Sequence, residues 1–249
     1  MAFRESMKGT RLYSIARKVY RTFRPLTVFQ LNDLYNRQFT EIMKRTLGSD
    51  STALDIGAHR GLLLREMFAI APGGRHYAFE PIPHLAESLT QEYPSARVHC
   101  TALSDQSGTA TFHYLPNSPE ESGLKLHRTH LKDPGNEEFT VSVRRLDEIV
   151  PANEKIALIK IDAEGAELPI IRGGLATIRR CRPPIVFETG TNTTPFYGVE
   201  PDDIFNTIVG DLEMRLSTMS RWLRGEKPYT KARFRRDYER TKDFYFMAY

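Results

Sequence analysis

An alternation of strand-like and helix-like segments from residue 52 onward constrains the fold of this chain more than any other feature. Short apolar runs favour strands, and longer amphipathic runs with a period near 3.6 favour helices. The strand-like segments are TALDIG, RHYAFEP, ARVHCTALS, GTATFHYL, EEFTVSVRRL, IALIKIDAEG, PPIVFETG, LEMRLSTM and DFYFMAY. The helix-like segments are GLLLREMFAIA, PHLAESLTQEY, AELPIIRGGLATIRRC (interrupted by Pro169 and Gly173-Gly174) and PDDIFNTIV. This order predicts parallel βαβ units with helices on both faces of the sheet.

The first 48 residues are predicted to be a basic helical extension, and residues 49–249 the main domain. An apolar stripe recurs at helical spacing from Leu12 to Phe23, Pro25 ends that helix, and a second helix begins near Phe29. No apolar run approaches the roughly 18–20 residues of a membrane span. The two cysteines form no CxxC pair and no secretory signal is recognisable, so we expect a cytoplasmic protein.

Charge is distributed unevenly along the chain. Residues 1–48 carry ten Lys/Arg against three Asp/Glu, a net +7, and residues 215–249 carry ten against four, a net +6. The middle, residues 49–214, carries fifteen against twenty-four, a net −9. Two interpretations stay open: the basic ends meet an anionic acceptor or membrane surface, or they fold back on the acidic middle.

The first strand-to-helix turn, in STALDIGAHRG, carries an acid and two glycines. In an open α/β sheet, ligands bind at the carboxyl ends of the strands. Gly57 and Gly61 allow positive φ and a close approach of the backbone to a ligand. No GK[ST] and no GxGxxG follows, which excludes the phosphate-loop and dinucleotide fingerprints. Asp55 suits a cationic ligand, such as the aminopropyl-sulfonium part of S-adenosylmethionine.

Two later strand ends complete the predicted cofactor site. Glu80, in FEP, follows Asp55 by 25 residues, at the position where an acid binds both hydroxyls of a ribose. Ser104 and Asp105, in ALSD, are expected to flank the adenine.

The segment IKIDAEGAE supplies the candidate reaction centre. Lys160 and Asp162 are two residues apart on one strand and therefore share a face. A lysine inside an apolar strand is costly unless it is paired, and a carboxylate such as Glu188 on the following strand would supply that pairing. Asp162 would face the transferred methyl group. Glu164 and Glu188 are neighbours that could share a divalent ion with Asp162, although no metal site is assigned.

Several of these blocks together resemble the FkbM family of methyltransferases. LDIGAHRG, FEP, ALSDQSGTATF, RLDEIV, IKIDAEGAE followed by IIRGG, and IVFETG occur in the order and spacing of that family over residues 50–190. The resemblance implies a Rossmann-like fold with a mostly parallel seven-stranded sheet. It also implies S-adenosylmethionine-dependent O-methyl transfer to a hydroxyl of a sugar or natural product. His59 stands where many methyltransferases have a glycine.

The resemblance implies that Asp55, Gly57 and Gly61 form the cofactor turn, that Glu80 holds the ribose and that Asp162 lines the reaction centre. The strand-end arguments above extend both sets of residues. The expected catalytic residues are Asp162, Glu164 and Lys160. The expected cofactor-binding residues are Asp55, Gly57, Ala58, His59, Gly61, Glu80, Pro81, Ser104 and Asp105. His113, His127 and His130 lie near a polar segment, residues 116–136, that could cover the acceptor and supply a base.

Two other functions remain as alternatives. The basic ends with Trp222, Tyr229, Phe234 and Tyr238 among arginines are compatible with a nucleic-acid methyltransferase. The [DNS]-P-P-[FYW] signature of amino-group enzymes is absent, however, because the fourth strand ends in DAEG. A non-catalytic S-adenosylmethionine-binding module is the second alternative. The expected acceptor is a small molecule or glycan, anionic or lipid-linked if the basic ends meet it.

Overall fold

The computed structural model describes residues 28–127, 129–241 and 243–249. The chain divides into two compact units, residues 1–37 and 38–249. The described part of the first unit is the beginning of α3 (Val28–Thr46), which continues into the second unit. The helix predicted between residues 12 and 23 lies outside the described residues. Within the described residues, no helix combines the length and the apolar character that crossing a membrane requires.

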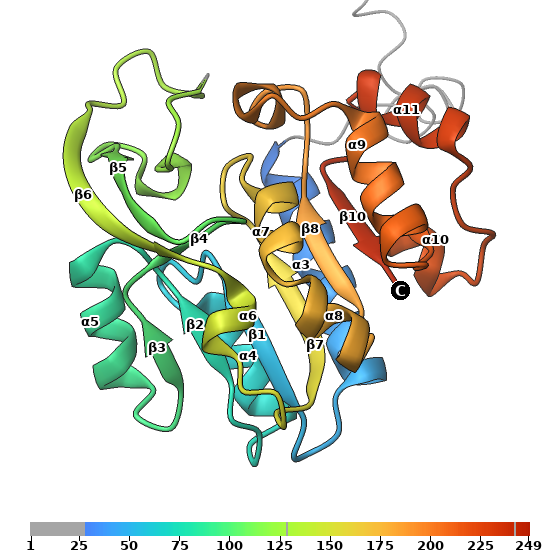
Figure 1. Ribbon diagram of the computed structural model, residues 1–249, viewed down its shortest axis with the longest axis horizontal. Helices are drawn as coiled ribbons and strands as arrows, with labels where there is room; N and C mark the ends of the chain where they lie inside the picture. The colour runs from blue at the N-terminus through green and yellow to red at the C-terminus, as the bar shows by residue number, and fades with distance from the viewer. Residues whose placement is uncertain (1–27, 128, 242) are drawn as a thin grey trace, which may run out of the picture. The chain divides into compact units, whose positions relative to one another are not determined.

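A seven-stranded sheet forms the centre of the second unit (Figure 1). Its order is β3-β2-β1-β7-β8-β10-β9, and only β10 runs antiparallel to its neighbours. The strands are β1 (Thr52–Ile56), β2 (Tyr77–Phe79), β3 (Arg97–His99), β7 (Ile156–Ile161), β8 (Ile185–Glu188), β9 (Leu216–Thr218) and β10 (Tyr245–Ala248). The predicted mostly parallel α/β sheet is confirmed.

Helices cover both faces of this sheet, as the alternation along β2 shows. Ala78 packs with residues of α4 (Leu62–Ile70) and α5 (Pro83–Glu92). Its neighbours Tyr77 and Phe79 point to the other face and join the core that contains α7 (Glu167–Gly173) and α8 (Leu175–Cys181). Each fully buried Leu, Ile or Phe of these two cores contributes about 1.5–3 kcal/mol to folding.

The glycine pair between α7 and α8 breaks the helix as predicted, but Pro169 does not. Pro169 is the third residue of α7, in the first turn, where a missing N–H costs no intrahelical hydrogen bond. A Cβ atom on Gly173 would lie 2.1 Å from the carbonyl oxygen of Ser104. The absence of a side chain at Gly173 therefore lets the connection after β4 (Ala102–Leu103) pack directly on α7.

A second, three-stranded sheet has the order β4-β6-β5, with β5 (Gly108–Tyr114) and β6 (Glu137–Arg144). The prediction that ARVHCTALS forms one strand is wrong: β3 belongs to the large sheet, while β4 pairs with β6. Thr101 helps to redirect the chain, because its Oγ1 donates a hydrogen bond to the Ser142 carbonyl oxygen at 2.9 Å. Ala102 then packs with Phe112 and Val143 in a small separate core.

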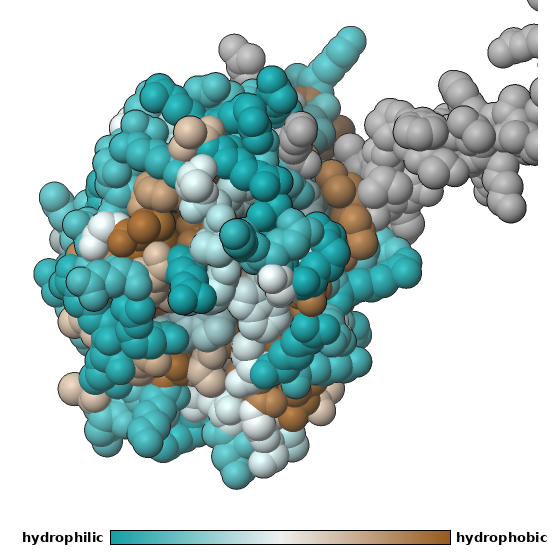
Figure 2. Space-filling view, turned by 90° about the vertical axis from the view of Figure 1, so that its right-hand side faces the viewer, coloured by the Kyte–Doolittle hydropathy of each residue, from teal (hydrophilic) through white to brown (hydrophobic). Residues whose placement is uncertain are grey.

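The C-terminal basic region is folded into the second unit. It contains α10 (Met219–Leu223) and α11 (Lys231–Glu239), which lie on the right of Figure 1 and face the viewer in the mostly hydrophilic surface of Figure 2. Lys231 pairs with Asp202 of the acidic middle at 3.2 Å. Phe234 and Tyr238 are buried. For this end of the chain, the contacts favour the interpretation in which basic residues fold back on the domain.

Short elements complete the described chain. They are η1 (Pro119–Glu121), α6 (Leu146–Ile149), η2 (Thr194–Tyr197), α9 (Pro201–Phe205) and the π-helical η3 (Asn206–Asp211).

Candidate active site

A buried ion pair links β1 and β7 at the candidate site. Lys160 Nζ lies 3.2 Å from Asp55 Oδ1 and donates a hydrogen bond to the Gly57 carbonyl oxygen at 2.7 Å. The expectation that Glu188 pairs with Lys160 is wrong. Asp55 stands directly opposite Lys160 in the β1–β7 ladder, whereas the residue of β8 opposite Lys160 is Val186, two positions before Glu188.

This pair explains how a lysine is accommodated inside an apolar strand. Burial would lower the pKa of Lys160, but the carboxylates of Asp55 and Asp162 outweigh that effect and raise it, so the lysine stays charged. Burial raises the pKa of Asp55, and the charge of Lys160 partly offsets the rise. Asp55 is thus matched by a cation of the protein itself, and its predicted contact with a cofactor stays a prediction.

The two glycines of the first turn are required by the packing of the protein. Gly57 has φ +75°, and a Cβ atom there would lie 1.8 Å from the backbone oxygen of Asp162. Gly61 has φ +73°, and its Cβ would lie 2.6 Å from Leu89 of α5. The close approach that was expected towards a ligand is made in this structure by the end of β7 and by α5. It brings the turn and Asp162 into direct contact.

Glu80 holds the same turn from the end of β2. Its Oε2 accepts a hydrogen bond from the His59 N–H at 2.7 Å, and its Oε1 accepts one from the Ile82 N–H at 2.9 Å. Burial raises the pKa of Glu80, and these two backbone donors partly offset the rise. Each carboxylate oxygen retains a second lone pair that could accept a ribose hydroxyl.

The structure brings seven of the nine predicted cofactor residues together at the carboxyl ends of β1 and β2. These are Asp55, Gly57, Ala58, His59, Gly61, Glu80 and Pro81. Ser104 and Asp105 instead follow β4 in the second sheet, because β3 already ends at His99. His99 and Cys100 are therefore the residues that occupy the end of the third strand of the large sheet.

Unsatisfied nitrogen atoms at these strand ends fit an adenosine-containing ligand. Among the described residues, the buried Nε2 atoms of His59 and His99 have no hydrogen-bond partner. Burial and the neighbouring cations Arg97 and Arg144 lower the pKa of His99. Its neutral ring stacks on Phe79 at 5.2 Å. The site thus offers unused hydrogen-bonding groups beside Glu80.

Asp162 stands at the end of β7 as a partly exposed acid of the candidate reaction centre. Its side chain is 27% exposed, and its Oδ2 accepts a hydrogen bond from the Tyr245 hydroxyl at 2.8 Å. The same oxygen lies 3.9 Å from Lys160 Nζ. Sequence reasoning missed Tyr245, because only the pairing of β10 with β8 places it here. The strand-like pattern DFYFMAY was the available signal.

Glu164 occupies the turn between β7 and α7 in a left-handed conformation, with φ 52°. Its Oε2 lies 3.1 Å from Nε2 of His127, whose side chain is only 3% exposed. Burial would lower the pKa of His127, but the hydrogen bond and charge of Glu164 outweigh it and raise the pKa. Of the three candidate histidines, His127 alone reaches Glu164. His113 lies against Glu138 and His130 against Glu121.

Glu167, a second residue that sequence reasoning missed, shapes this turn from the first position of α7. Its Oε1 accepts hydrogen bonds from the N–H groups of Ala163 at 2.9 Å and Gly165 at 3.1 Å. Burial raises the pKa of Glu167 to about 8. Buried and hydrogen-bonded to the backbone, it fixes the direction in which Asp162 and Glu164 leave the sheet.

Metal binding finds no geometric support here. In the part of the chain that the structure describes, no group of three or more His, Cys, Asp or Glu side chains is placed to hold an ion. The suggested sharing of a divalent ion by Asp162, Glu164 and Glu188 is therefore not carried further.

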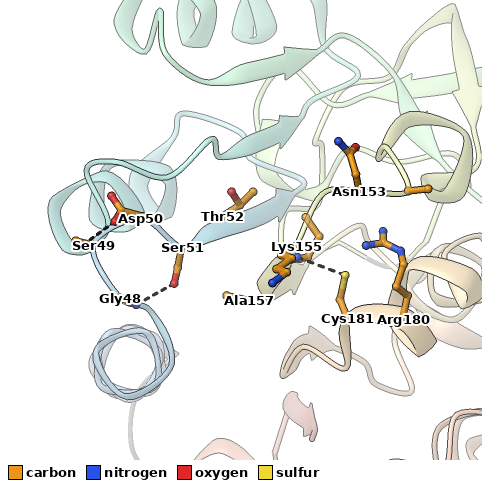
Figure 3. A pocket seen from close by; sticks show the side chains of 12 residues that line it. Gly48, Ser49, Asp50, Ser51, Thr52, Asn153, Lys155, Ala157, Arg180 and Cys181 are labelled. Atoms are coloured by element: carbon orange, nitrogen blue, oxygen red, sulfur yellow. Dashed lines mark hydrogen bonds between the residues drawn. The ribbon is translucent and has the colours of Figure 1, made fainter.

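A surface pocket of about 930 Å³ lies at the opposite ends of β1 and β7 (Figure 3). It is lined by residues 48–52, 152–153 and 155–157 and by Arg180 and Cys181. None of the predicted site residues lines it, and ligands of open α/β sheets bind at the carboxyl ends of the strands. We assign the candidate active site to the carboxyl ends.

Comparison with known proteins gives a consistent result. The sequence model described as "Methyltransferase FkbM domain" matches residues 55–215. The chain is 27% identical over 162 residues to the 2-O-methyltransferase NoeI of Sinorhizobium fredii (strain NBRC 101917 / NGR234), an alignment of 59% of this chain and 65% of that protein. It is 27% identical over 159 residues to the methyltransferase sdnD of Sordaria araneosa, covering 51% and 61%. The chain spans less than two thirds of the length of these relatives.

Among solved structures, the crystal structure of methyltransferase FkbM from Methylobacillus flagellatus KT matches with a TM-score of 0.50. The sequence identity is 16%, and the match covers 82% of this chain and 44% of that chain. At this identity, the likeness shows the fold alone.

Proposed function

This chain belongs to the FkbM methyltransferase domain family, and we propose that it transfers a methyl group from S-adenosylmethionine to a hydroxyl of a sugar or natural-product acceptor. The name of one relative, a 2-O-methyltransferase, supports oxygen as the methylated atom. Electrostatic and geometric features of the site support the same chemistry.

The observation that carries the proposal is the position of Asp162. Its partly exposed carboxylate lies at the end of β7, and its backbone oxygen contacts the turn that would hold the cofactor. When bound, S-adenosylmethionine supplies an electrophilic methyl group on a sulfonium. Glu80 and the turn around His59 would hold the nucleoside. Asp162 would accept the proton that the acceptor hydroxyl loses as its oxygen bonds to the methyl carbon, while the carbon–sulfur bond of the donor breaks and its electron pair stays on sulfur.

The other two expected catalytic residues, Lys160 and Glu164, serve this carboxylate indirectly. Lys160 supplies a buried positive charge 3.9 Å from Asp162 Oδ2. Glu164, closed against His127, limits the access of water to the same turn. Methyl transfer of this kind depends mainly on holding donor and acceptor in line.

A nucleic-acid acceptor gains no support from three of the four aromatic residues that raised it. Tyr229, Phe234 and Tyr238 are buried. Their rings contact one another and Phe246 of β10, so they belong to the core. They are not placed to stack on bases.

Substitution of Asp162 by asparagine tests the proposal. We expect Asp162→Asn to lower methyl transfer at least about 100-fold, because the amide cannot accept the proton. Affinity for S-adenosylhomocysteine should change less than about threefold, because the nucleoside contacts remain. Transfer is measured with S-adenosylmethionine labelled in its methyl group and with polysaccharide and glycolipid extracts as acceptors, and affinity by calorimetry.

Asp50→Asn is the matched control, because Asp50 is exposed at the opposite end of β1. It should leave both quantities unchanged. Near-normal transfer by Asp162→Asn would remove the catalytic role of this residue. A wild-type protein that binds S-adenosylhomocysteine but methylates nothing would favour the non-catalytic binding module.

A further inference from the structure

We propose that Tyr245 is a positioning residue, which holds the Asp162 carboxylate in its reactive orientation from a strand beyond the region that the family match covers. The inference rests on the proposed function for its catalytic meaning, but the contact itself is tested independently of activity. The family match ends at residue 215, whereas Tyr245 begins β10.

The position of Tyr245 follows from the antiparallel pairing of β10. Tyr245 stands opposite Glu188 in the β8–β10 ladder, so their side chains share a face of the sheet. On the other side of β8, Ile161 of β7 pairs with Phe187. This register lets the Tyr245 hydroxyl reach across β8 to Asp162 Oδ2, at 2.8 Å.

The hydrogen-bonding capacity of Asp162 leaves room for an acceptor. An ionised carboxylate offers about four lone-pair positions. Tyr245 takes one of them, and a side-chain hydrogen bond with Glu188 takes a second. The remaining positions can receive an acceptor hydroxyl. Two bonds from neighbouring strands restrict rotation of the carboxylate, which a single bond would allow.

Tyr245 and Glu188 are both suited to donate. Burial, followed by the charges of Asp162 and Glu188, raises the pKa of Tyr245 well above its ordinary value. Burial, followed by the charges of Asp162 and Glu164, raises the pKa of Glu188 in the same way. Both groups therefore keep their protons, and the Tyr245 hydroxyl donates its proton to Asp162 Oδ2.

Loss of the Tyr245 hydroxyl should make the charge on Asp162 harder to hold. The charged or titratable groups around Asp162, apart from Tyr245, are Lys160, Asp55, Glu164, Glu167, Glu188 and His59. Most of these are acids, so a donor that stabilises the carboxylate has few replacements. Tyr245→Phe removes that donor and keeps the ring.

The experiment follows the carboxyl carbon of Asp162 by ¹³C NMR through a pH titration, with Asp162→Asn to assign the signal. In Tyr245→Phe, the midpoint of this titration should rise by about one pH unit. The midpoint of the acid limb in the pH profile of methyl transfer should move to higher pH by the same amount. The value of kcat should fall about tenfold. Affinity for S-adenosylhomocysteine, measured by calorimetry, should stay within about twofold of the wild type.

Tyr229→Phe is the matched control. Tyr229 is a buried tyrosine, and its ring centre lies 6.3 Å from that of Phe246, the neighbour of Tyr245 in β10. Its hydroxyl forms a hydrogen bond with Asp237. Both variants lose a hydrogen-bonded phenol hydroxyl and should lose similar thermal stability. Only Tyr245→Phe should move the titration of Asp162. Equal midpoints in Tyr245→Phe and the wild type would overturn the proposal.

A second measurement uses the unsubstituted ring, in case Tyr245→Phe does not fold. The Cζ resonance of one tyrosine in the wild type should titrate with the same midpoint as Asp162, and this response should vanish in Asp162→Asn. Absence of such a tyrosine would overturn the proposal. If the response is present but the wild type methylates no acceptor, the positioning contact stands and the proposed function alone fails.

Discussion

At the scale of single residues, Glu80 combines a predicted role in ribose binding with a role in stabilising the turn after β1. Its carboxylate is 3% exposed and accepts one backbone hydrogen bond at each oxygen, from His59 and Ile82. A buried acceptor that satisfies two backbone donors cannot be removed without cost. The residue expected to hold the ribose therefore also holds the turn in place.

Glu80→Ala should weaken both functions. It leaves the N–H groups of His59 and Ile82 without an acceptor, at a cost of about 1–3 kcal/mol each. For a chain of 249 residues, we expect the melting temperature to fall by roughly 4–24 °C. S-adenosylhomocysteine binding should weaken at least about tenfold, because the paired hydrogen bonds to the ribose are lost. Calorimetry below the melting transition and a thermal melt measure the two effects.

Glu80→Gln and Glu87→Ala sharpen this test. The glutamine keeps one acceptor oxygen. The melting temperature and the S-adenosylhomocysteine affinity of Glu80→Gln should therefore lie between those of the wild type and the alanine variant. Glu87 is exposed on α5, so its loss should change neither quantity. Unchanged affinity in Glu80→Ala would remove the ribose assignment while leaving the structural role of Glu80 intact.

At the scale of elements, one contact joins the second sheet to the turn after β7. The segment between β5 and β6 carries His127, which closes on Glu164. Gly123 of the same segment also approaches Glu164, because a Cβ there would lie 3.3 Å from the Glu164 Cβ. The polar segment that was expected to cover the acceptor is thus attached at the candidate reaction centre.

This contact should make stability depend on pH. The folded-state pKa of His127 is raised, so its contribution is full below the ordinary histidine value of about 6.5 and is lost as the pH rises through the folded-state value. His127→Gln should therefore lower the free energy of unfolding at pH 6 by about 1–2 kcal/mol, and by less at pH 8.5. Urea denaturation at the two pH values measures this difference.

His113→Gln provides the control for an element-scale effect. His113 lies on β5 against Glu138, whose side chain is 53% exposed, and exposed ion pairs contribute little. At pH 6, His113→Gln should lower the free energy of unfolding by less than His127→Gln does. If His127→Gln and the wild type differ equally at both pH values, the charged contact with Glu164 is not what fastens the segment.

At the scale of the whole molecule, the two basic ends differ. The C-terminal end is folded into the domain, where Arg221 pairs with Glu226 and Lys231 with Asp202. Residues 1–24 carry seven Lys/Arg and one Asp/Glu, and the apolar stripe from Leu12 to Phe23 lies among them. This pattern predicts a basic amphipathic helix, and such helices are typical of proteins that bind anionic membranes.

Deletion of residues 1–24 should abolish binding to vesicles that contain anionic lipid. Each basic residue near such a surface contributes about 1 kcal/mol. Screening within about 10 Å at 0.1 M salt should weaken the binding of the full chain as salt rises. Sedimentation with vesicles of phosphatidylcholine and phosphatidylserine measures it. Arg235→Gln with Arg236→Gln is the charge control, because these residues pair within the fold.

A thermal melt separates the competing interpretation. If the full chain binds no vesicles and deletion lowers the melting temperature strongly, residues 1–24 stabilise the fold and do not contact a membrane.

The sequence by itself determined most elements of the large sheet and the grouping of seven predicted cofactor residues at its strand ends. The spacing of apolar residues that distinguishes strands from helices can be seen within short segments of sequence. The carboxyl ends of parallel strands necessarily meet at one edge of the sheet. The resemblance in IKIDAEGAE likewise located Asp162 and Glu164 without knowledge of distant segments.

Only the tertiary structure decided which residues became partners. Lys160 pairs with Asp55 instead of Glu188, β4 leaves the large sheet for β6, and Tyr245 reaches Asp162 across 83 residues of sequence. Each outcome depends on strand order and register, since a shift of one residue reverses every side chain of a strand. Register is set by the packing of the whole sheet, which no local window of sequence contains.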